Sequence, residues 1–188
     1  MMLTTPRLIL REWRDEDLAP LATMTSDPEV MRFFTDIRPG ARSDAWAARA
    51  RAHFAQHGFG IWAVEAPGVA DFIGFVGLST VPPEFPTGAG VEIVWTLDRP
   101  FWRRGYALEA ARAAIADGFT RLGLGEILAF TATVNLPSRA LMERLGMTRD
   151  AAGDFEHPRV PEGHPLRPHV LYRIRPPQES SAGINLQP

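Results

Sequence analysis

The segment from residue 91 to residue 134 constrains the fold most, because its pattern is strand, helix, strand. "VEIVWTL" (91–97) is an apolar strand pattern, an Ala-rich helix pattern follows at about 106–121, and "EILAFTATV" (126–134) is again strand-like. Two strands joined through a helix lie parallel in one sheet. Such a unit leaves a crevice beyond the carboxyl ends of its strands, where ligands commonly bind. The sequence therefore predicts a ligand site near the start of this helix.

The rest of the chain predicts hairpins on one side of this unit. The strand patterns before residue 91 are separated by linkers rich in Gly and Pro, which is typical of antiparallel connections. We therefore expect one mixed sheet flanked by helices, an α+β fold with an antiparallel N-terminal half and a parallel strand–helix–strand unit. Residues 1–175 are expected to form a single domain, and 176–188, which lack any period, a disordered tail. The other expected elements are strands at 7–13, 60–66, 71–80 and 169–175, a helix that starts near Asp15, a short helix after Asp27, and helices at 43–58 and 138–146.

The composition excludes several classes of chemistry. The 188 residues include no cysteine, and all 20 basic residues are arginine, so thiolate metal sites, a cysteine nucleophile and a lysine Schiff base are ruled out. A net charge of -2 gives no reason to expect binding to nucleic acid or to an anionic membrane. No apolar run is long enough for a membrane span or a signal peptide. We expect a cytoplasmic protein with a small-molecule or protein partner.

The turn before the central helix reads Trp102-Arg103-Arg104-Gly105-Tyr106-Ala107. Gly105 allows close approach of a ligand, Ala107 keeps the first turn uncluttered, and the N–H groups of that turn have no partner within the helix. With the helix dipole and Arg103 and Arg104 alongside, this is a site for a phosphate or pyrophosphate. The alternative is that Gly105 only starts a helix and the arginines are a solvated edge. A P-loop and a Rossmann glycine motif are both absent.

The surrounding residues resemble a known family. "VEIVWTLDRPFWRRGYALEA" followed by "TATVNLPSRALMERLGM" is similar to the Gcn5-related N-acetyltransferase (GNAT) superfamily, in particular to its RimJ/RimL-type branch of ribosomal-protein N-terminal acetyltransferases. The opening "TPRLILREWRDEDLAPLATMTSDPEVMRF" and the closing "HVLYRI" extend the resemblance over most of 3–175. It implies a GNAT fold with acetyl-CoA as co-substrate. The family turn Q/R-x-x-G-x-G/A cradles the coenzyme A pyrophosphate, and here Trp102 stands in place of the Gln or Arg.

The resemblance also implies direct attack of an amine on acetyl-CoA in a ternary complex, and it assigns roles to residues of the 91–97 strand. Glu92 occupies the position of the family's catalytic glutamate and is the candidate base; the alternative is a structural carboxylate paired with an arginine. Backbone N–H groups around Trp95, Thr96 and Leu97 would serve the oxyanion and the pantetheine arm, because in the family the strand splays here.

The "NLPS" segment carries the last candidates. By resemblance, Asn135 contacts the cofactor and Ser138 lies near its sulfur as an acid. The alternatives are a helix N-cap for Asn135 and an ordinary first-turn residue for Ser138.

The acceptor is expected to be a primary amine, either a protein or peptide N-terminus or a small molecule. The loop that contains His157, His164 and His169 has no standard metal-ligand spacing, so no metal is expected, and we expect this loop to influence acceptor choice. A non-catalytic acyl-CoA-binding module, or transfer of a different acyl group, remains an alternative function. The chain is expected to be a monomer or a homodimer.

Overall fold

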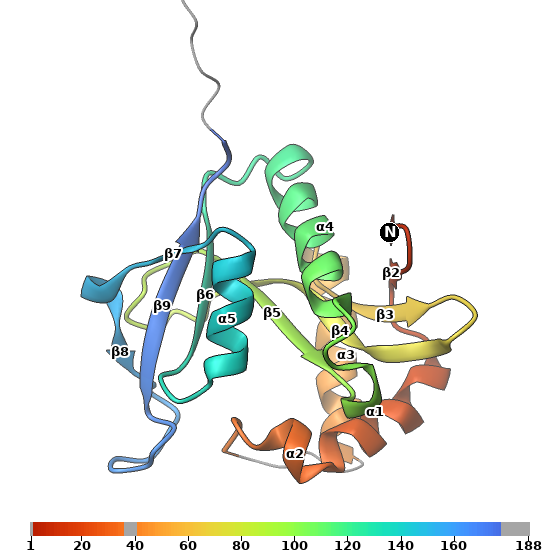
Figure 1. Cartoon of the computed structure of the whole chain (residues 1–188), viewed down its shortest axis with the longest axis horizontal. Coiled ribbons are helices and arrows are strands. Elements are labelled where there is room, and N and C mark those ends of the chain that lie inside the picture. Colours follow the sequence, from red (N-terminus) through yellow and green to blue (C-terminus); the bar gives the residue numbers. More distant parts are fainter. Residues whose placement is uncertain (1, 36–40, 178–188) are drawn as a thin grey trace, which may run out of the picture.

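A computed structural model describes residues 2–35 and 41–177, so the predicted tail (176–188) lies outside the described residues from 178 onward. Within the described residues, one mixed sheet has the strand order β1-β2-β3-β4-β5-β6-β9-β7, and β8 also pairs with β9 (Figure 1). The strands are β1 (Leu3–Thr4), β2 (Ile9–Arg11), β3 (Ile61–Ala66), β4 (Ala70–Thr80), β5 (Val91–Leu97), β6 (Ile127–Ala132), β7 (Thr148–Arg149), β8 (Phe155–Glu156) and β9 (Pro168–Ile174). The α-helices are α1 (Leu18–Ser26), α2 (Pro28–Met31), α3 (Ala41–His57), α4 (Tyr106–Thr120) and α5 (Leu136–Arg144).

The predicted mixed sheet is confirmed. Strands β1 to β5 pair antiparallel in chain order, and β5 and β6, joined through α4, are parallel. Strand β9 then returns antiparallel along the free side of β6, and the two-residue strands β7 and β8 pair with β9. The parallel part of the sheet is therefore confined to β5 and β6.

Helices cover both faces of the sheet. Helix α4 packs on β4 and β5 and α5 on β6, whereas α1 and α3 pack on β4 and β3 on the opposite face (Figure 1). Residues directly opposite each other in a sheet point to the same face. Thr96 and its partner Phe75 therefore point to the α1–α3 face, and Trp95 and its partner Val76 to the α4 face.

Helix α4 lies against the sheet mainly through small residues. Ala110, Ala114 and Gly118 form the buried side, and a Cβ atom placed on Gly118 would meet Ile127 Cδ1 at 2.9 Å. Ala111 and Ile115 are buried in the same core, and Leu108, Phe119 and Leu122 pack against it while remaining partly exposed.

Candidate active site

The parallel strands β5 and β6 separate along their length. Only Glu92 of β5 has a register partner on β6, which is Leu128. Beyond this point β5 stays paired with β4, and β6 with β9, each as far as its carboxyl end. The facing edges of β5 and β6 are therefore open towards their carboxyl ends, in agreement with the splay that the resemblance implies.

The ladder between β4 and β5 determines which backbone groups of β5 face this gap. Val81 donates its N–H to the carbonyl of Gly90 (2.9 Å), and Asp98 donates to that of Ile73 (2.9 Å). Hydrogen-bonded pairs alternate with unbonded pairs along an antiparallel ladder. The pairs Val81–Gly90 and Ile73–Asp98 are both hydrogen-bonded pairs, one at each end of the ladder. The even-numbered residues of β5 therefore form hydrogen bonds with β4. The odd-numbered residues point their N–H and C=O groups towards β6.

Of the three predicted cofactor-binding residues of the strand, this alternation directs the backbone groups of two towards the gap and those of one towards β4. Thr96 has its N–H and C=O in the ladder with β4, opposite Phe75. Trp95 and Leu97 direct theirs into the gap. The Trp95 carbonyl accepts from the Thr96 hydroxyl (2.9 Å), and the Leu97 carbonyl accepts from the Trp102 indole (2.6 Å). The gap therefore contains two directed N–H donors, those of Trp95 and Leu97.

The N-terminus of α4 follows the carboxyl end of β5 after a short loop, and it is open to a ligand. Gly105 is its N-cap residue, in the left-handed region (φ 80), and no side chain caps the helix. The first N–H within the helix to find a partner is that of Glu109, which donates to the carbonyl of Gly105 (3.1 Å). The N–H groups before it, at Tyr106, Ala107 and Leu108, have no intrahelical acceptor. Free N–H groups at a helix N-terminus suit an anion, and the exposed side chains of Arg103 and Arg104 add positive charge beside them.

Sequence reasoning missed two residues that hold this helix terminus in place. Glu109, in the first turn of α4, accepts from the N–H and the Nε of Arg7, at 2.9 and 2.7 Å. Arg7 also donates to the carbonyl of Arg104 (3.0 Å), and its guanidinium lies over the ring of Tyr106, 4.9 Å from the centroid. The "PRL" segment gives no sign of these contacts, because the residues are about a hundred positions apart in sequence.

Trp102, the departure from the family turn, has a structural contact in this chain. Its bond to the Leu97 carbonyl joins the last residue of β5 to the loop that leads into α4. A Gln or Arg at this position would lack the rigid indole. Trp102 thus fixes the loop, and the free backbone N–H groups lie further along it, at Tyr106 and Ala107.

Glu92 is a part-buried carboxylate at the point where β5 and β6 begin to separate. It lies on the same face of the sheet as Val94 and Thr96. Among the described residues, no donor bonds to it and no arginine pairs with it, in contrast to the structural alternative. Burial raises the pKa of Glu92 to about 8, against a smaller opposing influence of the Arg159 charge. A carboxyl group with this pKa can take up and release a proton near neutral pH.

Asn135 and Ser138 meet at the start of α5. The Asn135 side chain is the N-cap: its Oδ1 accepts from the Ser138 N–H (3.3 Å), and its Nδ2 donates to Thr131 Oγ1 (2.9 Å). The N-cap alternative for Asn135 is thus observed. The Ser138 hydroxyl has no hydrogen-bond partner in the described part of the chain. It stays available to a ligand.

The histidine loop joins an aromatic cluster on the same face as Glu92. The ring of His157 lies 4.7 Å from that of His169 and 4.9 Å from that of Phe85, between centroids. Burial lowers the pKa of His157 to about 4 and also lowers the pKa of His169, so both imidazoles are neutral at pH 7. The described residues contain no group of three or more side chains arranged to hold a metal ion.

Fold and site together define a class of protein: an enzyme with an uncapped helix N-terminus beside a splayed parallel strand pair and a part-buried carboxylate. A family model described as "Acetyltransferase (GNAT) domain" matches residues 7–148. The chain belongs to the GNAT acetyltransferase family.

Relatives and solved structures agree with this assignment. The chain is 30% identical to "Uncharacterized protein YkkB" of Bacillus subtilis over 77% of this chain and 84% of that protein. It is 32% identical to "FsC-acetyl coenzyme A-N(2)-transacetylase" of Aspergillus fumigatus over 78% of this chain and 64% of that protein. An acetyltransferase structure from Agrobacterium tumefaciens superposes with a TM-score of 0.76 at 25% identity, covering 94% of this chain and 95% of the other. None of the described helices has the length and apolar character needed to cross a membrane.

Proposed function

We propose that this protein is an acetyl-CoA-dependent N-acetyltransferase that acetylates a primary amine by direct attack in a ternary complex. The observation that carries the proposal is Glu92: a part-buried carboxylate without a partner among the described residues, its pKa raised to about 8, located where the gap between β5 and β6 begins. Acetyl-CoA supplies the activated acetyl group.

The chain offers a fitting set of groups for coenzyme A. The uncapped N–H groups of Tyr106 and Ala107 and the side chains of Arg103 and Arg104 would hold the pyrophosphate. The gap, with the N–H groups of Trp95 and Leu97, would hold the pantetheine arm, and Thr96 would support it from the β4 ladder. Asn135 fixes the start of α5 beside the arm.

Three protein groups then serve the chemistry. Glu92 accepts the proton of the incoming ammonium, directly or through one water. The N–H group of Trp95 or Leu97 donates to the acyl oxygen as its negative charge develops. The hydroxyl of Ser138 donates a proton to the departing thiolate; because a thiol has a pKa of about 8.5, this last contribution is small.

The acceptor and the branch of the family belong to the same proposal. Among solved structures, a "putative ribosomal-protein-serine acetyltransferase" from Vibrio cholerae shares the fold at 19% identity and a TM-score of 0.74. Together with the sequence motifs this favours a RimJ/RimL-like enzyme with a peptide N-terminus or a small amine as acceptor. We propose a single-domain enzyme, a monomer or homodimer, that works in the cytoplasm without a metal.

The first experiment is thermal unfolding with increasing coenzyme A or acetyl-CoA, followed by thiol release with amines. Ligand at about 100 times its dissociation constant adds about 2.7 kcal/mol of stability. For a chain of this length that corresponds to a rise in Tm of roughly 5–10 °C. No rise at millimolar coenzyme A would refute the cofactor assignment. A rise without thiol release for any amine would favour the non-catalytic acyl-CoA-binding alternative.

A further inference from the structure

The N-terminal segment 5–8 is attached to the first turn of α4 through the carboxylate of Glu109. Glu109 Oε1 accepts from the Thr5 hydroxyl (2.7 Å) and from the Arg7 N–H (2.9 Å). Its Oε2 accepts from Arg7 Nε (2.7 Å) and lies 2.6 Å from Arg7 Nη2. Both carboxylate oxygens are therefore bonded to this segment, and the Glu109 side chain is only 17% exposed.

Arg7 also reaches the turn that precedes the helix. It donates to the carbonyl of Arg104 (3.0 Å), and its guanidinium lies over the ring of Tyr106. Arg103 and Gly105, on either side of Arg104, both have a left-handed backbone (φ 59 and 80). A residue with a side chain rarely adopts this conformation, so surrounding contacts must hold it at Arg103. The bond from Arg7 to the Arg104 carbonyl is one of these contacts.

The same bond sets the direction of the Gly105 N–H group. The C=O and N–H groups of a trans peptide point in opposite directions. Because the Arg104 carbonyl is turned towards Arg7, the Gly105 N–H is turned away from Arg7, and no described residue accepts from it. Gly105 is the N-cap residue of α4, so its N–H joins the free N–H groups of the first helical turn.

Without Arg7, Glu109 would oppose an anion at this terminus. It lies three residues inside α4 from Tyr106, about 4.5 Å along the helix axis. A carboxylate in the first turn is attracted to the same free N–H groups that bind an anionic ligand, and it repels that ligand. Burial opposes ionisation of Glu109, but hydrogen bonds from Thr5 and Arg7 outweigh it and lower its pKa, so the group is charged at neutral pH. Arg7 balances this charge and keeps it bonded to the N-terminal segment.

We propose that Arg7 is a positioning residue of the cofactor site: by pairing with Glu109 and holding the Arg104 carbonyl, it keeps the N-terminus of α4 free for the pyrophosphate of coenzyme A. The proposal rests on the proposed transferase function and adds a residue, far from the turn in sequence, on which cofactor affinity depends. Because Arg7 acts through Glu109, the effect of losing Arg7 should depend on whether Glu109 is charged.

The test is a double-mutant cycle on Arg7 and Glu109, with calorimetric titration of coenzyme A and of inorganic pyrophosphate. Arg7→Ala leaves an unpaired carboxylate beside the helix terminus and should raise the Kd of both ligands by about tenfold or more. Glu109→Gln removes that charge and should bind both ligands at least as tightly as the native protein. The double variant should bind them about threefold or more tightly than Arg7→Ala alone.

Kinetics and an ion pair at the other end of α4 separate positioning from general stability. Arg7→Ala should raise the KM for acetyl-CoA by about tenfold or more and change kcat less than about twofold, because the groups proposed for the chemistry are untouched. Arg121→Ala removes the ion pair with Asp117 (2.6 Å) and the bond to the Gly58 carbonyl (3.2 Å). This control should lower Tm without changing the Kd of coenzyme A.

Arg7→Lys serves if Arg7→Ala does not fold. It keeps a positive charge beside Glu109, but one ammonium group cannot reproduce the fork that bonds to both Glu109 and the Arg104 carbonyl. Its Kd for coenzyme A should rise by about threefold or more, and Glu109→Gln in the same chain should reverse part of that rise.

The outcomes separate this proposal from the proposed function. Equal losses in Arg7→Ala and Glu109→Gln, with no recovery in the double variant, would reduce the contact to a structural clamp and overturn the positioning role. Native affinity in Arg7→Ala, or a fall in kcat at constant KM, would overturn it too. A native protein that binds pyrophosphate but not coenzyme A overturns the cofactor assignment alone, and the cycle is then decided with pyrophosphate. A native protein that binds neither ligand overturns both.

Discussion

Replacing Glu92 by Gln should make the protein more stable at alkaline pH. Burial raises the pKa of this carboxyl group from 4.5 to about 8, so between these two values the folded chain holds a proton that the unfolded chain has released. Raising the pH therefore favours unfolding, by about 1.4 kcal/mol per pH unit at most. If the whole rise of the pKa from 4.5 to about 8 acted on stability, ionising Glu92 would lower the free energy of unfolding by about 5 kcal/mol. We expect about half of this loss, because the side chain keeps some contact with solvent.

The Gln variant lacks this ionisation. The difference in the free energy of unfolding between the variant and the native protein should stay close to its pH 5 value until Glu92 begins to lose its proton. By pH 9 this difference should have moved by about 2–3 kcal/mol in favour of the variant. Urea unfolding of both proteins at pH 5, 7 and 9 measures the difference directly. Glu16→Gln, at an exposed carboxyl group, is the control and should give the same difference from the native protein at every pH.

The same substitution should lower kcat by about 10²- to 10⁴-fold, the usual contribution of a general base, with the stabilisation by coenzyme A retained. In the native protein, kcat/KM should rise with pH and level off above about 8, as Glu92 ionises. A stability difference that stays constant from pH 5 to 9 would mean that the carboxylate is solvated, and an unchanged pH–rate profile in the variant would remove Glu92 from the reaction.

Three further substitutions test the remaining parts of the site. Gly105→Asp should weaken coenzyme A binding at least tenfold in a titration. Gly68 has a similar left-handed backbone (φ 73 against 80) but lies in the β3–β4 turn, so Gly68→Asp should bind coenzyme A normally. Equal losses in the two variants would mean that backbone strain, and not contact with the ligand, causes the effect. Ser138→Ala should lower kcat less than about tenfold without a change in Tm, because only its N–H is used in the fold; a loss as large as that of Glu92→Gln would contradict a minor acid. Asn135→Ala should cost about 1 kcal/mol in urea unfolding through loss of the N-cap, and unchanged stability would contradict the capping geometry.

Patterns that belong to a single element could be predicted from the sequence. The strand at 91–97 has the predicted bounds, and the turn at Gly105 and the N-cap at Asn135 lie where the local residue types indicated. These features depend on contacts within a few residues. Alternation along one strand is also sufficient to put Glu92 and Thr96 on the same face.

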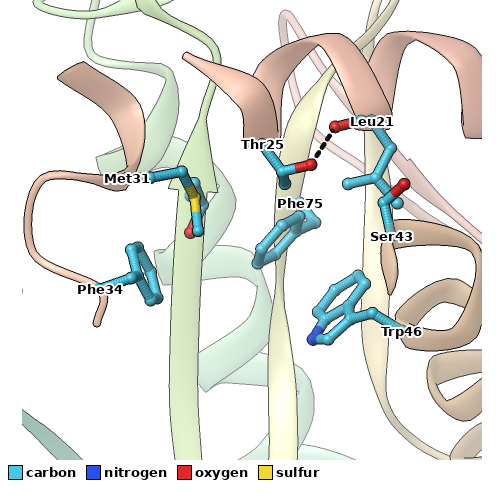
Figure 2. A pocket seen from close by; sticks show the side chains of 8 residues that line it. Leu21, Thr25, Met31, Phe34, Ser43, Trp46 and Phe75 are labelled. Carbon is cyan, nitrogen blue, oxygen red and sulfur yellow. Dashed lines mark hydrogen bonds between the residues drawn. The ribbon is translucent and has the colours of Figure 1, made fainter. Parts of the chain in front are cut away.

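Features that depend on how distant segments meet could not be predicted. Whether Trp95, Thr96 or Leu97 offers its N–H to the gap depends on the register with β4, which a strand pattern does not contain. The contact between Arg7 and Glu109 joins two residues that are 102 positions apart in the sequence. The two-residue strands β7 and β8 are too short to produce a period. A small hollow lined by Leu21, Met31, Phe34, Trp46 and Phe75 exists only where helices meet the sheet (Figure 2).

The separation of β5 from β6 should be visible in the hydrogen exchange of backbone amides when no ligand is bound. Backbone amides that a neighbouring strand would normally bond have no partner strand at Trp95 and Leu97, so they should exchange their hydrogens with D₂O faster than the amides in the ladder with β4. A ligand whose arm contains amide groups can take the place of the missing strand, and binding would then slow this exchange. Affinity and local protection are thus linked through the same few groups. A nucleotide fragment without the arm should bind the helix terminus yet leave these amides exchanging freely.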